Sequence, residues 1–129
     1  MTDLHHLLAI LVVAATVTLL AASGWSASAT RRSGRTRDHR FAVDRLVLAV
    51  IGLVVANGLV GLVLIGTAGR PADALHLLYG PAALATLPVG VSLSRRASAR
   101  AAAPRRSDGW LVVATIVLLG IELRLFATG

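Results

Sequence analysis

The chain contains no cysteine, which excludes a disulfide framework, thiolate metal ligands and thiol redox chemistry. Charged residues are also scarce, at 15% of 129 residues, and few of them lie inside the long apolar runs. No basic residue precedes the first apolar run, so residues 1–30 lack the positive start of a cleaved signal peptide, although ASGWSASA has the small residues of a cleavage site. What remains is an apolar chain, 56% hydrophobic, with a mean hydropathy of +0.77.

The apolar residues fall into four blocks, at about 4–23, 46–66, 74–93 and 109–127. Each block has about 20 residues, the length that an α-helix needs to cross ~30 Å of hydrocarbon. Lipid offers the backbone no hydrogen-bond partners, so these blocks must be helical. The sequence therefore predicts an all-α fold, a four-transmembrane-helix bundle in which residues 1–129 form a single membrane domain.

The arginines predict how the bundle is oriented. They are concentrated in two predicted loops, 24–45 and 94–108, and the short segment between the middle helices carries only Arg70. The positive-inside rule places both arginine-rich loops in the cytoplasm and both termini outside, in a multi-pass protein of the plasma (inner) membrane. We expect these arginines to bind anionic lipid headgroups of the bilayer rather than nucleic acid.

With this orientation, most ionisable side chains outside the two loops gather at the outer end of the bundle. The candidate site residues among them are His5, His6, Arg70, His76, Tyr79 and Arg124. Histidines from different helices at one level are typical of metal and haem sites in helical bundles, and two neutral imidazoles can ligate a haem iron. We therefore expect His76, with either His5 or His6, to bind haem b, and Arg70 and Arg124 to meet the haem propionates. The alternative is that these histidines are merely interfacial.

The helix predicted over 46–66 adds two candidate cofactor contacts. Asn57 is its only strongly polar residue, and Gly61 is one of several glycines that would let a flat cofactor or a neighbouring helix come close. The same residues are also consistent with helix packing and one interhelical hydrogen bond.

These features resemble one four-helix half of the heme A synthase family. His5-His6-Leu7-Leu8-Ala9 is similar to the histidine motif that opens the family's first helix. Asn57 to Gly61, followed by LVLIGTAG, resembles the end of its second helix, and Leu75-His76-Leu77-Leu78 resembles its third. The resemblance implies a membrane b-type cytochrome with His76 as one axial ligand. It leaves open an oxidoreductase activity like that of heme A synthase, because this chain holds one bundle where full-length members have two.

The first hypothesis is thus a haem b-binding membrane protein in electron transfer or haem handling linked to the respiratory chain. The second is a non-catalytic structural subunit or assembly factor of a larger membrane complex. The third is a copper or zinc site built from His5, His6 and His76, with Asp3, Asp73 or Glu122 as a further ligand. Expected partners are the lipid bilayer and either further copies of the chain or respiratory-complex subunits.

Overall fold

The computed structural model describes residues 2–33, 37–68, 75–100 and 107–128, and all of them are helical. The four helices are α1 (Thr2–Ser33), α2 (Arg37–Ala68), α3 (Leu75–Arg100) and α4 (Ser107–Thr128). The predicted all-α, four-helix fold is confirmed. Each helix contains an apolar span long enough to cross a membrane: Asp3–Ser28, Phe41–Thr67, Leu77–Ala97 and Gly109–Ala127.

The helices are longer than the apolar blocks suggested. Residues 24–33 and 37–45, predicted as loop, continue α1 and α2, and residues 94–100 continue α3. Hydropathy marks the part of a helix that contacts lipid, whereas backbone hydrogen bonding carries the helix onward through Ala, Ser and Arg. The arginine-rich segments are therefore in large part helix ends rather than loops.

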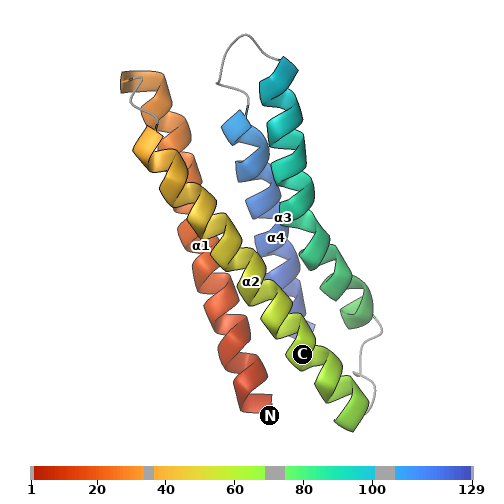
Figure 1. The fold of residues 1–129 in the computed structure, drawn as a ribbon. Coiled ribbons are helices and arrows are strands. Elements are labelled where there is room, and N and C mark those ends of the chain that lie inside the picture. Colours follow the sequence, from red (N-terminus) through yellow and green to blue (C-terminus); the bar gives the residue numbers. More distant parts are fainter. Residues whose placement is uncertain (1, 34–36, 69–74, 101–106, 129) are drawn as a thin grey trace.

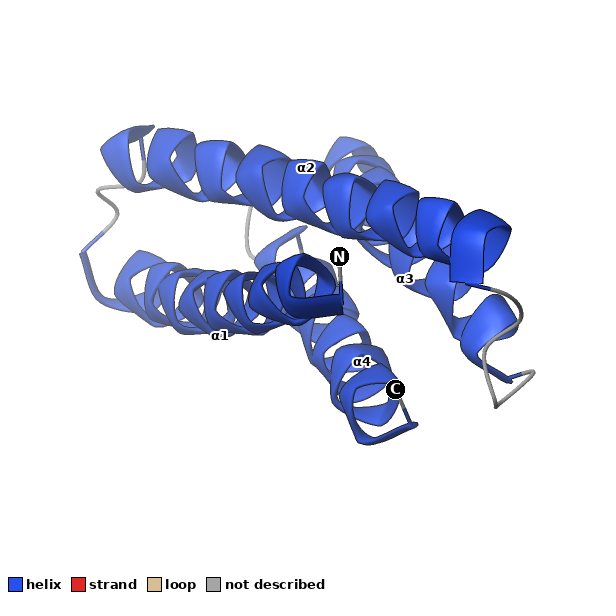
Figure 2. Ribbon diagram, turned by 90° about the horizontal axis from the view of Figure 1, so that it is seen from below, coloured by secondary structure: helices blue, strands red, loops and turns tan. Residues whose placement is uncertain are grey.

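The helices form a ring in the order α1, α2, α3, α4 (Figures 1 and 2). Each packs against its two neighbours in that ring, most closely in the pair α3 and α4 and least closely in the pair α2 and α3. Among the described residues, the diagonal pairs, α1 with α3 and α2 with α4, have no close backbone approach. The space between the backbones of α1 and α3 must therefore be filled by side chains or by a bound ligand.

The buried positions follow a heptad-like spacing. On α2 they are Val43, Val47, Val50 and Val54, and on α4 they are Leu111, Ala114, Thr115, Leu118 and Glu122. Steps of three and four residues place these side chains on one stripe, which is the seam of left-handed helix packing. Large apolar side chains on the outer faces, such as Leu48, Leu62 and Leu78, stay exposed, as expected of a surface in contact with lipid.

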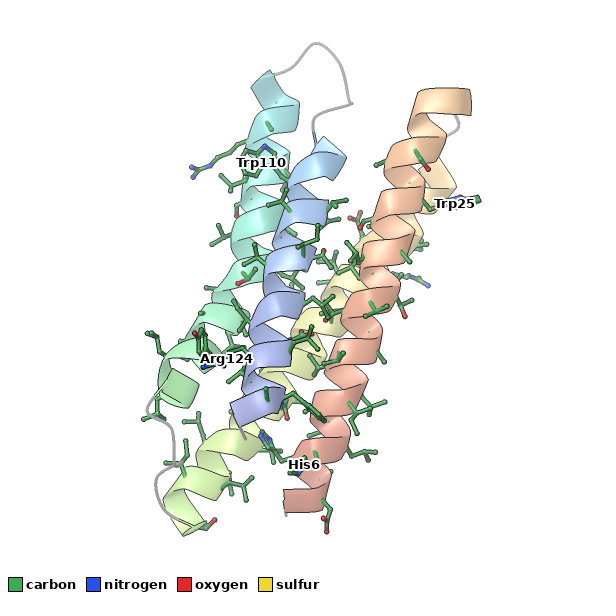
Figure 3. The ribbon with its side chains drawn as sticks, turned by 180° about the vertical axis from the view of Figure 1, so that it is seen from behind. His6, Trp25, Trp110 and Arg124 are labelled. Atoms are coloured by element: carbon green, nitrogen blue, oxygen red, sulfur yellow. The ribbon has the colours of Figure 1, made fainter. Side chains whose placement is uncertain are left out.

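The two ends of the bundle differ in character. One end, called here the histidine end, is formed by residues 2–9, 61–68, 75–80 and 125–128, and both described chain ends lie there (Figure 1). Trp25 and Trp110 lie toward the opposite end, away from His6 (Figure 3). Both tryptophans are exposed, as are Arg95 and Arg96 at the end of α3. Tryptophan and arginine together are typical of a membrane interface. We call this opposite end the arginine end.

Candidate functional site

A cavity of about 90 Å³ opens among α1, α2 and α4 and reaches the histidine end. Its polar lining consists of His5, His6, Asn57 and Glu122. Its apolar walls are Ala9, Val12, Val13, Leu125 and Phe126. The heptad seam of α1 and α4 places Val12 and Glu122 inside the bundle, so the cavity replaces part of the core at this end.

The two neighbouring histidines have different surroundings. His5 is half-buried, its Nδ1 atom is shielded from solvent, and its Cε1 atom lies 3.6 Å from where a Cβ on Gly61 of α2 would be. His6 is exposed, and its ring meets that of His5 edge-on, with centroids 6.5 Å apart and an interplanar angle of 73°. Because successive residues on a helix point about 100° apart, only one of them can face α2 closely. The structure places His5 in that position.

Glu122 is held deep in the bundle by α1. Its side chain is 7% exposed, and Thr16 Oγ1 donates a 2.8 Å hydrogen bond to its Oε1 atom. The other oxygen, Oε2, is buried and has no hydrogen-bond partner among the described residues. The buried hydroxyls of Ser23 and Thr115 are satisfied within their own helices: Ser23 donates to the carbonyl of Leu20 at 3.1 Å and Thr115 to that of Leu111 at 2.7 Å.

The helices are staggered along the bundle axis. Thr16 and His5 are eleven residues apart on α1, which is about 16 Å at 1.5 Å per residue. Glu122, bonded to Thr16, therefore lies near the middle of the Asp3–Ser28 span, although it is only five residues from the end of the Gly109–Ala127 span. Glu122 is thus near the end of its own helix but deep in the bundle, because α4 ends well short of the end of α1.

Asn57 lies between these two levels. It is one helical turn from Gly61, which faces His5, and its Oδ1 atom is buried without a hydrogen-bond partner in the described part of the chain. The cavity therefore has polar groups at its mouth, at an intermediate depth and at its inner end. Asn57 and Gly61, two of the predicted cofactor contacts, are brought to the same place as His5.

The remaining predicted site residues lie elsewhere or outside the described residues. Arg70 falls in the segment 69–74, which is not described. His76 is the second residue of α3, at the histidine end, and its side chain is outside the described set. Tyr79 is half-buried and Arg124 is exposed, and neither lines the cavity. Figure 3 shows Arg124 on the α3 side of α4, away from His6.

The metal-site hypothesis finds no cluster in the described residues. Among the side chains that the structure describes, no group of three or more histidine, aspartate or glutamate residues could hold a metal ion. The described imidazoles are the adjacent pair on α1, and His76, the third predicted ligand, lies outside the described side chains, so the copper or zinc hypothesis stays a prediction.

A scan of known protein families, a search of curated proteins and a search of solved structures each found no match to the chain. The functional argument therefore depends on the site alone.

Sequence reasoning considered Glu122 only as a further ligand of a copper or zinc site, and not as a residue of the cofactor site. Two signals could have found it: it is the only glutamate in the chain, and it lies in an apolar run at a heptad step from Leu111, Thr115 and Leu118. An ionisable residue on the inner stripe of a membrane helix is a functional candidate by default.

Proposed function

We propose that the chain is a haem b-binding four-helix membrane protein that resembles half of a heme A synthase and serves electron transfer or haem handling linked to the respiratory chain. The observation that carries this proposal is the inward-facing imidazole of His5, at the end where α3 begins with Leu75-His76. These two histidines belong to α1 and α3, the diagonal pair without close backbone approach. A porphyrin needs such a separation between its two axial ligands.

The donor chemistry at this end fits a haem. His5 would supply one axial nitrogen and His76 the other, and Gly61 leaves the α2 face next to His5 without a side chain. The bound haem would supply a one-electron iron couple. The protein would hold the iron in a largely apolar wall made by Val12, Val13 and Phe126, which limits access of water to it.

The volume of the site sets a condition on binding. Cofactor pockets are typically about 300–1,000 Å³, whereas the cavity here is about 90 Å³. A porphyrin therefore requires the bundle to widen at the histidine end. The contact between α2 and α3 is the weakest in the ring, so we expect the haem to separate these two helices.

The test is a reduced-minus-oxidised visible spectrum of the purified protein, expressed with ample haem. We expect the sharp α-band of low-spin haem b in the wild type, its loss in His5→Ala and His76→Ala, and its retention in the matched control His6→Ala. If the band survives in His5→Ala and disappears in His6→Ala, the ligand assignment on α1 is wrong. A folded, colourless wild type refutes haem binding.

The colourless outcome would favour the second function, a structural subunit or assembly factor. Co-purification with a larger membrane complex, unchanged by His76→Ala, would then support that role. The apolar outer faces of the four helices leave room for such helix contacts within the bilayer.

A further inference from the structure

The cavity gives the buried carboxyl of Glu122 a polar route to the surface. At its mouth lies the exposed His6, so the cavity opens at the histidine end, close to the start of α1. Further in, Asn57 contributes a buried amide oxygen, and Glu122 closes the inner end with a buried carboxyl oxygen. The two oxygens lack hydrogen-bond partners among the described residues and line the same space.

This space is large and polar enough for water. A single water needs about 10–15 Å³ and two to four polar partners, and the cavity offers about 90 Å³. A few waters could thus connect His5, Asn57 and Glu122. Unsatisfied buried acceptors call for such donors, because leaving them bare is costly in an apolar interior.

The surroundings of Glu122 offer no fixed positive charge. Thr16 on α1 is its only hydrogen-bond partner in the described chain, and no described side chain forms an ion pair with it. The titratable groups that line the cavity from α1 are His5 and His6, and α2 contributes only the neutral Asn57. Arg124, two residues along α4, lies on the side toward α3, and the described residues of α3 do not line the cavity (Figure 3).

We infer that Glu122 is a proton-binding group of this protein and exchanges its proton, through water in the cavity, with the aqueous phase at the histidine end. A hydronium ion gives its proton to the carboxylate and leaves water, and the reverse step returns the proton. A carboxylate at this depth has no fixed cation to stabilise its negative charge. Because a buried unpaired charge is costly, the group is more stable there when it binds a proton and becomes neutral. Beyond Glu122, toward the arginine end, the buried hydroxyls of Ser23 on α1 and Thr115 on α4 donate to carbonyls of their own helices, and neither lines the cavity. The exchange is therefore assigned to the histidine end, and it does not depend on haem.

The chain itself provides a clean probe. Glu122 is its only glutamate, and it contains no glutamine, so protein labelled with ¹³C-glutamate carries one side-chain carboxyl signal in the unmodified sequence. With the protein in lipid nanodiscs, we expect the Cδ chemical shift of Glu122 to move between carboxylic acid and carboxylate values as the bulk pH is changed. A shift that stays constant over the whole range in which the protein remains folded overturns the inference.

The route is tested by blocking it. Ala9 lines the cavity, whereas Ala14 on the same helix is exposed. We expect Ala9→Leu to slow hydrogen–deuterium exchange of the protonated carboxyl several-fold, measured from the isotope shift of its carbonyl stretch, and the matched variant Ala14→Leu to exchange at the wild-type rate. Equal rates in both variants would show that the proton reaches Glu122 by another way, and would overturn the assigned route.

Discussion

The closest helix contact in the bundle can be tested at Gly90. A Cβ atom built on Gly90 of α3 would overlap the Cβ atom of Ala114 on α4 and would also lie 3.7 Å from the backbone oxygen of Trp110. The Ala114 side chain is short and rigid and cannot turn away, whereas the Trp110 oxygen is at ordinary van der Waals distance. Gly90→Ala can be accommodated only if α3 and α4 move apart along their most closely packed seam.

The expected change in the free energy of unfolding combines two opposing contributions. Overpacking of this kind typically costs about 1–3 kcal/mol, while replacing glycine by alanine within a helix gains about 0.5–1 kcal/mol. Gly52 on α2 provides the matched control, because a Cβ there would meet nothing within 4 Å. The helix term is shared by both variants, so we expect Gly90→Ala to be less stable than Gly52→Ala by about 1–3 kcal/mol.

The assay is reversible unfolding in mixed micelles, followed by circular dichroism, with the free energies of the two variants compared at one detergent composition. The double variant Gly90→Ala/Ala114→Gly should recover most of the stability lost in Gly90→Ala, because removal of the Ala114 methyl group restores the missing space. If Gly90→Ala proves as stable as Gly52→Ala, the reasoning about the α3–α4 contact is refuted.

Three further predictions address other parts of the molecule. Thr16→Val should lower the free energy of unfolding by about 0.6–1.7 kcal/mol, the range for interhelical hydrogen bonds in membranes, whereas Thr16→Ser should keep the wild-type value. If Thr16→Val also unfolds with the wild-type free energy, the hydrogen bond contributes nothing to stability. Gly61→Leu should abolish the haem b spectrum by crowding the imidazole that faces it, and Gly66→Leu, which has open space, should not; equal spectra would argue against haem at this face. Because the chain has no native cysteine, single cysteines at Ser98 and Thr2 can report the topology. In intact cells, an impermeant thiol reagent should label only the cysteine at position 2, and the reverse pattern would contradict the assigned orientation.

The number and type of helices could be predicted from the sequence because two robust signals coincide. Four apolar blocks of membrane-crossing length leave the backbone no other way to satisfy its hydrogen bonds in lipid. The ends of the helices could not be predicted in this way, because residues 24–33 and 37–45 contain charged and hydroxyl side chains that interrupt the apolar blocks but are still helical. Hydropathy indicates whether a side chain prefers lipid or water, and it does not indicate whether the backbone of that residue is hydrogen-bonded in a helix.

The candidate site was predictable only in part. His5, Asn57 and Gly61 were selected from the sequence and lie together at one end of the bundle. The depth of Glu122 was not predictable, because it depends on how far α4 is shifted along α1, and that shift is fixed by side-chain packing between helices that are distant in the sequence. The choice of His5 over His6 as the inward-facing imidazole likewise required the position of Gly61 on a second helix.

The hydrogen bond between Thr16 and Glu122 joins the first helix of the chain to the last, 106 residues apart. During synthesis, α1, α2 and α3 therefore enter the bilayer before the partner of Thr16 exists. The ring can close only after α4 has left the ribosome, so a chain that lacks α4 would leave its inner stripe open to lipid and to quality-control proteases. Closure of the four-helix ring therefore depends on the synthesis of α4, which follows that of the other three helices.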